Sequence, residues 1–146
     1  MGKLSIAPGR LCLWLVAAAS LAATTSVAGA DKSPKPSVSL RANPAVGFAP
    51  TRVVLTAELK GGADDYEEFY CATVEWVWGD DTKSESKNDC EPYQAGKSEI
   101  QRRFVTDKTF QEAGVYRVEF RLKQKNKVVG IGRTEVKIQE GIGGRD

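Results

Sequence analysis

The stretch over residues 74–81 reads Val-Glu-Trp-Val-Trp-Gly-Asp-Asp and constrains the fold more than any other part of the chain. Side chains alternate between the two faces of a β-strand, so Trp76 and Trp78 lie on the same face. Gly79 and the aspartates after it are residues that favour turns. This pattern predicts a half-buried antiparallel strand, starting near Phe69, that runs into a tight turn.

Other stretches show the same alternation. Residues 115–123 and 128–138 alternate apolar and polar side chains on either side of a polar turn, which predicts a hairpin of two long strands. Short strands are expected at residues 38–40, 51–59 and 99–105, whereas residues 82–96 are polar and irregular. About seven strands with no convincing helix predict an all-β fold, a two-sheet antiparallel β-sandwich of the immunoglobulin type.

The first thirty residues do not fit this pattern. Lys3 and Arg10 precede an apolar, alanine-rich run that ends in the small residues Ala28-Gly29-Ala30. This arrangement predicts a secretory signal peptide over residues 1–30, with no membrane span left after cleavage and a secreted or periplasmic location. The alternative is an uncleaved membrane anchor. Residues 31–37, rich in proline, lysine and serine, are expected to form a flexible linker, and residues 140–146 a disordered tail.

Removal of the signal peptide changes the charge balance. It takes away two of the 21 basic residues and none of the 19 acidic ones, so 19 of each remain. A mature chain without net charge gives no support for nucleic acid binding. Acidic residues are concentrated in the first half of the domain and basic residues in the second, which predicts either cross-strand ion pairs or two faces of opposite sign.

Two cysteines remain after cleavage, Cys71 and Cys90. In an exported chain such a pair predicts one structural disulfide. The chain contains no histidine and no Cys-x-x-Cys motif, so a zinc or redox role is disfavoured.

The tryptophan stretch is followed further along by Phe110-x-x-x-Gly114-x-Tyr116-x-Val118. Together these two motifs resemble those of the PKD (polycystic kidney disease repeat) domain. That family has an aromatic-x-aromatic-Gly-Asp-Gly turn followed by a Tyr or Phe and then Gly-x-Tyr-x-Val. The corresponding residues here are Trp76, Trp78, Gly79, Asp80, Phe110, Gly114, Tyr116 and Val118. Asp81 replaces the second glycine of the turn, and the cysteine pair is not a family feature. The resemblance implies a PKD-like β-sandwich over residues 38–139.

Several of these residues have a predicted structural role. Trp76 stands where such sandwiches hold a core tryptophan, and Gly114-x-Tyr116 resembles a tyrosine corner, in which the phenol oxygen bonds to the backbone. Val118 occupies the place of an inter-sheet cysteine, with Leu55 expected opposite it. We expect aliphatic packing to replace that bridge.

Catalysis finds little support in the sequence. Without histidine, Ser-His-Asp and Cys-His arrangements cannot form. Asp80 and Asp81 are adjacent on a turn, with no sign of a cleft around them, so the carboxylate pair of a glycosidase is not indicated. The chain is therefore predicted not to be an enzyme.

Calcium is the one metal ion for which the sequence offers candidate ligands. Oxygen ligands at one end of an extracellular sandwich suit calcium, and the resemblance to PKD-like domains allows for it. The candidate ligands are Asn43, Asp64, Asp65, Asp80 and Asp81, with Glu67 nearby. A solvated acidic face or side-chain capping of turns explains the same residues. No other cofactor is predicted.

Two functions follow from these observations. The favoured one is a noncatalytic exported module for protein–protein interaction or adhesion, whose partner is an envelope or extracellular protein. The alternative is a carbohydrate- or polymer-binding module, possible only if Trp78, Tyr70 or Tyr93 exposes an aromatic face for sugars to stack on. A spacer domain is a third reading.

Overall fold

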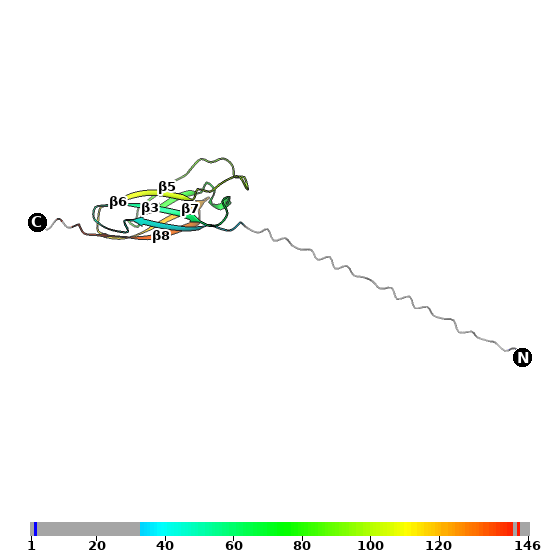
Figure 1. Cartoon of the computed structure of the whole chain (residues 1–146), viewed down its shortest axis with the longest axis horizontal. Helices are drawn as coiled ribbons and strands as arrows, with labels where there is room; N and C mark the ends of the chain where they lie inside the picture. Colours follow the sequence, from blue (N-terminus) through cyan, green and yellow to red (C-terminus); the bar gives the residue numbers. More distant parts are fainter. Residues whose placement is uncertain (1, 3–32, 142, 144–146) are drawn as a thin grey trace. The chain divides into compact units, whose positions relative to one another are not determined.

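A computed structural model describes residues 2, 33–141 and 143 of the chain (Figure 1). Apart from Gly2, the predicted signal peptide lies outside the described residues, and of the predicted tail only residues 140, 141 and 143 are described. Among the described residues, none belongs to a helix with the length and apolar character that crossing a membrane requires.

Strands dominate the described part of the chain. In chain order the elements are β1 (Ser37–Asn43), β2 (Val46–Phe48), β3 (Thr51–Lys60), the short 3₁₀ helix η1 (Glu67–Phe69), β4 (Thr73–Val77), β5 (Lys83–Ser86), β6 (Arg103–Phe110), β7 (Gly114–Gln124) and β8 (Lys127–Gln139).

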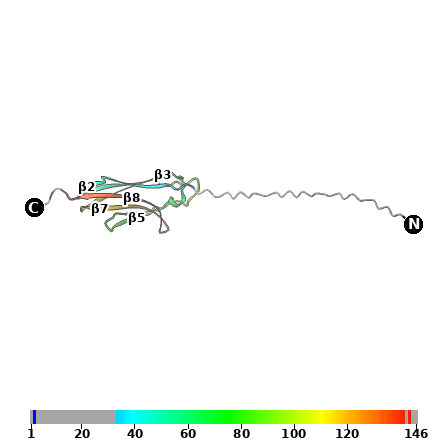
Figure 2. The same ribbon diagram turned by 90° about the horizontal axis from the view of Figure 1, so that it is seen from below.

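These strands form two sheets. One has the order β1-β3-β6 and the other the order β2-β8-β7-β4-β5. Figure 2 shows β3 in one layer and β7 and β5 in the other. This arrangement is that of an immunoglobulin sandwich. One of its two sheets corresponds to β1, β3 and β6, and the other includes β4, β7 and β8. The predicted fold class is confirmed, with one parallel pair, β2 with β8, in an otherwise antiparallel structure.

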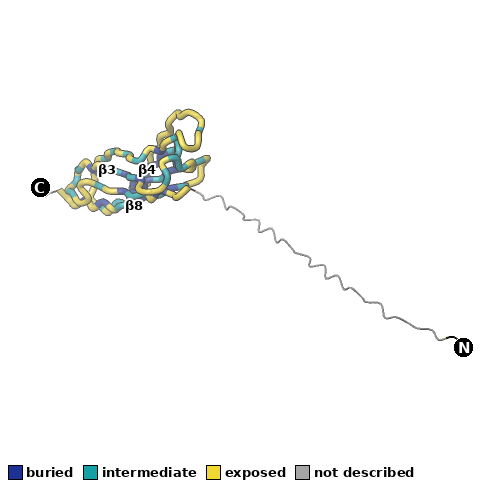
Figure 3. The backbone as a smooth tube through the Cα atoms, turned by 45° about the vertical axis from the view of Figure 1, so that its right-hand side comes forward, coloured by how far each residue is buried: buried dark blue, intermediate teal, exposed yellow. Residues whose placement is uncertain are grey.

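The core fills the space between the sheets (Figure 3). Alternate residues of β3 and β7 contribute to it, and both strands are apolar at every second position there, as the sequence pattern predicts. Residues of β1, β4, β6, β8 and η1 also belong to it. Leu55 and Val118, expected opposite one another, are both fully buried. The other fully buried core residues are Val53, Ala57, Phe110, Phe120, Leu122 and Val136.

Two strand boundaries differ from those predicted. The tryptophan strand begins at Thr73 and not near Phe69, because η1 and a left-handed backbone at Cys71 (φ 50°) occupy the preceding residues. β6 covers Arg103–Phe110, whereas we expected a strand at residues 99–105. The reason is that Lys108 lies on its inward face and interrupts the apolar alternation.

Two further strands were not predicted. β5 consists of four exposed polar residues and is held only along β4, so no apolar pattern marks it. β2 has three residues and follows the point where the chain leaves β1 and crosses to the other sheet. Residues 33–36, within the predicted linker, precede β1, and the carbonyl of Pro34 accepts a hydrogen bond from the Ala63 amide (2.9 Å).

Candidate functional site

Trp76 and Trp78, which open the family motif, are core residues. Each is only 7% exposed, and their rings stack with centroids 6.0 Å apart. Trp76 also meets the ring of Phe120 edge-on at 4.9 Å. The indole nitrogen of Trp78 donates a hydrogen bond to the Ser84 hydroxyl (3.2 Å). Trp78 therefore offers no face on which a sugar could stack.

The turn after the tryptophans closes one end of the sandwich. Gly79 has φ +80°, and a Cβ there would lie 2.7 Å from the backbone of Arg117, so only glycine fits. Asp81, which replaces a family glycine, also adopts a left-handed backbone (φ 62°), a conformation that aspartate tolerates better than most residues. Asp80 points at Lys108, with an Oδ2–Nζ distance of 2.6 Å.

Asp80 is held in its charged form. Partial burial raises the pKa of this carboxyl group, but hydrogen bonds from Lys108 and Thr82 outweigh burial and bring the pKa below its ordinary value. The Lys108 ammonium lies 5.1 Å from the ring centre of Trp78. Contacts among these four side chains, Asp80, Thr82, Lys108 and Trp78, stabilise the end of the core.

Gly114 and Tyr116 form the expected tyrosine corner. The Tyr116 hydroxyl donates a hydrogen bond to the carbonyl of Glu112 (2.8 Å), and its ring packs on Phe110 at 4.3 Å. The three aromatic and glycine positions of the second family motif, Phe110, Gly114 and Tyr116, thus lie together in this corner.

Glu75 is a buried carboxylate on the outer face of the larger sheet. Its side chain is 4% exposed, and its oxygens lie 3.3 Å from Lys83, 3.3 Å from Arg121 and 3.4 Å from Lys123. Burial raises the pKa of Glu75, but the hydrogen bonds from these cations outweigh burial and lower the pKa overall. Cross-strand ion pairs of this kind were the simpler of the two explanations of the uneven charge distribution.

The candidate calcium ligands are not brought together. Asp64 pairs with Arg102, just before β6, whereas Asp80 pairs with Lys108 near the other end of that strand. Asp65 accepts a hydrogen bond from the Gly96 amide (2.8 Å). Asn43 ends β1, paired with Val54, and Asp81 is exposed. Over residues 33–141, no three Asp, Glu or Cys side chains are grouped as metal ligands would be.

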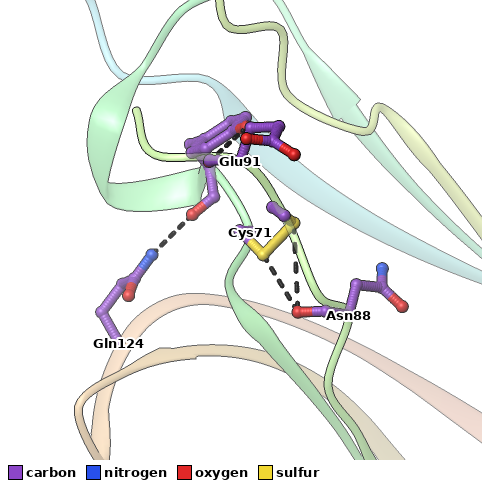
Figure 4. The surroundings of a disulfide bond; sticks show 6 residues. Cys71, Asn88, Glu91 and Gln124 are labelled. Atoms are coloured by element: carbon purple, nitrogen blue, oxygen red, sulfur yellow. Dashed lines mark hydrogen bonds between the residues drawn. A yellow bond between two sulfur atoms is a disulfide. The ribbon is translucent and has the colours of Figure 1, made fainter. Parts of the chain in front are cut away.

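The predicted disulfide joins two loops at the end of the sandwich opposite Asp80. Cys71, between η1 and β4, is bonded to Cys90, in the long connection from β5 to β6, with the two Cα atoms 6.1 Å apart. Figure 4 shows Asn88, Glu91 and Gln124 around the bond. The bridge therefore fixes a long, mostly exposed loop onto the strand that carries the tryptophans.

A groove of about 470 Å³ lies beside this disulfide. We call it the tyrosine groove. Three segments contribute to it, namely η1 with the residues after it, the disulfide loop and the β7–β8 turn. Its lining residues are Glu67, Glu68, Tyr70, Cys71, Cys90, Glu91, Tyr93, Gln124 and Lys125.

Tyr70 is fixed in the groove by its neighbours in sequence and space. The adjacent Phe69 is buried, and its ring occupies the space that a Cβ on Gly130 would need. The Gln124 amide donates a hydrogen bond to the Tyr70 carbonyl (2.7 Å), as Figure 4 shows. The Tyr70 hydroxyl donates to the Glu91 carbonyl (2.9 Å).

Tyr93 lies against Tyr70, with ring centroids 5.6 Å apart. Its hydroxyl donates to the Asp65 carbonyl (2.7 Å), which ties the disulfide loop to the loop before η1. Partial burial, followed by the charges of Asp65 and Glu67, raises the pKa of the Tyr93 phenol. Two carboxylates thus lie near this ring.

Sequence reasoning identified part of this groove. It gave the disulfide and named Tyr70 and Tyr93 as the aromatic residues whose exposure would matter. It named Glu67 only as a neighbour of the candidate calcium ligands, and it missed Glu68, Glu91, Gln124 and Lys125 as lining residues, because the lining comes from separate loops. A disulfide between two loops was the only signal that the loops meet.

Comparison with known proteins gives similarity to solved structures only. One is the PKD domain of an M14-like peptidase from a Thermoplasmatales archaeon, with 16% identity and a TM-score of 0.46, covering 73% of this chain and 99% of that one. Another is the CARDB domain of a Pyrococcus furiosus protein in complex with di-metal ions, with 12% identity and a TM-score of 0.46, covering 75% and 97%. No protein-family model matches the sequence, and the comparison with curated proteins finds no match.

The strand order defines the class of protein. The chain carries an immunoglobulin-like β-sandwich domain with a disulfide between two loops at one end. A PKD domain, whose motif the sequence resembles, is among the solved structures similar to it.

Proposed function

We propose that this chain is an exported, noncatalytic module that binds another envelope or extracellular protein through the tyrosine groove. The observation that carries the proposal is the groove itself, which is built from two tyrosines and held by a disulfide. Tyrosine contributes a large, rigid contact area to protein interfaces. Loops that are already fixed lose little conformational entropy when a partner binds.

The position of the groove supports the same proposal. It lies where the β3–β4 loop and the β7–β8 turn come together. The equivalent end of immunoglobulin variable domains carries the loops that contact antigen. Binding residues concentrate on loops that a rigid scaffold positions.

Export rests on the sequence of residues 1–30 and on the disulfide, since such bonds persist in oxidising compartments. A full-length chain expressed in a secreting host should yield a mature protein that begins at Asp31. Intact-mass measurement of the extracytoplasmic protein tests this expectation. A mass that includes residues 1–30 would contradict it.

The binding function is tested with the oxidised mature domain, immobilised and exposed to envelope and extracellular extracts. We expect retention of a specific protein that Tyr93→Ser weakens. Phe48→Ser is the matched control, because Phe48 is an exposed aromatic residue on β2, at the other end of the sandwich. Equal retention by the Tyr93→Ser variant and the wild-type domain would contradict the proposal.

Carbohydrate binding is the second candidate, and the observation in its favour is that Tyr70 and Tyr93 line a groove. The buried Trp78 cannot contribute to it. Polysaccharides included in the same retention experiment separate the two functions. Retention of a polysaccharide alone, lost in Tyr93→Ser, would favour this candidate over protein binding.

A further inference from the structure

We propose that the tyrosine groove recognises a basic segment of its protein partner and accommodates a lysine or arginine side chain between its aromatic rings and its carboxylates. This inference rests on the proposed function and specifies the chemistry of the partner. It is carried by the charge and the composition of the groove.

The charges that line the groove are predominantly negative. Glu67, Glu68 and Glu91 face a single cation, Lys125. Within residues 33–141, none of these three carboxylates has a lysine or arginine nitrogen within ion-pair distance. On the outer sheet face, by contrast, Glu75 and Glu119 are each paired with more than one cation.

The groove adds two aromatic rings to these carboxylates. Tyr70 and Tyr93 are half-buried, and both hydroxyls are bonded to backbone carbonyls. The ring faces therefore remain as the part of these residues that a ligand can contact. Faces of aromatic rings attract cations, and nearby carboxylates strengthen that attraction.

The carboxylates and the tyrosine rings together favour a basic side chain in the groove. A lysine or arginine side chain has an apolar stem that packs along tyrosine and a charged end that carboxylates bind. An acidic segment would be repelled by the three glutamates, and a neutral one would bring no cation to them. Charge complementarity of this kind selects the partner and accelerates association.

The disulfide makes the arrangement specific to the oxidised chain. Glu91 lies immediately after Cys90 and Tyr93 three residues after it, and Tyr70 lies immediately before Cys71. The bond thus brings the carboxylate and the two rings to the same place. Reduction frees the loop that carries Glu91 and Tyr93 from β4, so we expect it to weaken binding of the basic segment.

The experiment is a fluorescence anisotropy titration of the oxidised mature domain with a short labelled peptide of alternating lysine, glycine and serine. The comparison peptide has the same sequence with every lysine acetylated, which removes the charge and keeps the length. We expect binding of the lysine peptide to be at least about tenfold tighter than binding of the acetylated peptide, and to weaken as salt is added.

Two double variants locate the site. Glu67→Gln/Glu91→Gln should weaken binding of the lysine peptide about tenfold. The matched control is Glu112→Gln/Glu140→Gln, which changes net charge equally but lies at the other end of the sandwich, and it should bind as the wild type does. Circular dichroism of each variant checks that the fold is retained.

Equal binding of the two peptides would overturn the inference, as would equal loss in both double variants. Failure of this inference is distinct from failure of the proposed function. A protein retained through Tyr93 that the lysine peptide does not displace would leave protein binding standing and refute the basic segment. Retention of no protein would instead refute the proposed function.

Discussion

At the scale of single residues, Glu75 shows how a buried charge contributes to this sheet. Its folded pKa is lowered because Lys83, Lys123 and Arg121 stabilise the carboxylate more than burial destabilises it. A lowered pKa stabilises the fold above the ordinary glutamate pKa of about 4.3, and this contribution is lost as pH falls through the folded pKa.

We therefore expect Glu75→Gln to lower the free energy of unfolding by about 1–3 kcal/mol at pH 7. The difference from the wild type should shrink in acid, where the wild-type carboxyl is protonated and resembles the amide. Urea unfolding across the acidic range measures it. Glu135→Gln, at an exposed pair with Lys137, is the control and should have little effect. A difference that stays constant with pH would contradict this account.

Trp76 is the second residue with a large expected effect. Its indole is buried against Trp78 and Phe120, so truncation leaves a cavity that the two sheets cannot close. Trp76→Ala should lower the free energy of unfolding by about 3–5 kcal/mol, as measured by denaturant unfolding. Val115→Ala, on an exposed face, should change it by less than about 0.5 kcal/mol. Similar losses in the two variants would show that Trp76 is not a core residue.

At the scale of elements, β6 is an edge strand, whose unpaired backbone groups invite association with other strands. Lys108 lies on its inward side, where its Nζ contacts Asp80 and the Thr82 hydroxyl (2.8 Å). An inward-pointing charge on an edge strand is a recognised protection against such association. The lysine thus stabilises the end of the core and protects the edge.

Lys108→Met tests whether Lys108 stabilises the end of the core through Asp80. The variant removes the ammonium group that lowers the pKa of Asp80, whereas the burial that raises this pKa remains. The pKa of Asp80 should therefore rise. NMR titration of the Asp80 side-chain carboxyl carbon measures it. The wild type is stabilised by this pair above the ordinary aspartate pKa of about 3.9, and the contribution fades in acid. At pH 7 the variant should lose about 1–2 kcal/mol. Lys137→Met is the control, and an unchanged pKa of Asp80 in Lys108→Met would refute the assignment.

The same elements show what sequence reasoning can and cannot supply. β3 and β7 were predictable because each buries every second side chain, and that burial requires alternation. β5 was not, because its polar residues interact with the fold only through the backbone of β4. The alternation that puts Trp76 on the inner face puts its neighbour Glu75 on the outer face, but the burial of Glu75 depends on cations from β5 and β7, which no local pattern reveals.

The tyrosine groove was predictable only in part for a related reason. The pair of cysteines and the predicted export gave the disulfide, and the sequence marked Tyr70 and Tyr93 as the aromatic residues whose exposure would matter. The meeting of Glu67 with Glu91 and Lys125 depends on how three loops fold over one another. Loops have no periodicity, so their contacts do not appear in sequence patterns.

At the scale of the whole molecule, the disulfide spans 19 residues and closes a loop that includes β4 and β5. The double variant Cys71→Ser/Cys90→Ser should lose about 3 kcal/mol of unfolding free energy, chiefly because its unfolded chain is less constrained. Urea unfolding with and without reductant measures the loss. Reductant should destabilise the wild type and leave the variant unchanged, and an effect on both would contradict this explanation.

The parallel pairing of β2 with β8 has a mechanical consequence. Residue 33 and residue 141 lie at opposite ends of the sandwich (Figure 2), so tension between them pulls β1 along β3 and β2 along β8. The bonds between Ala45 and Lys137 and between Ala49 and Gln139 then carry load together. Strands loaded in shear resist a stretching force collectively and do not peel apart one bond at a time.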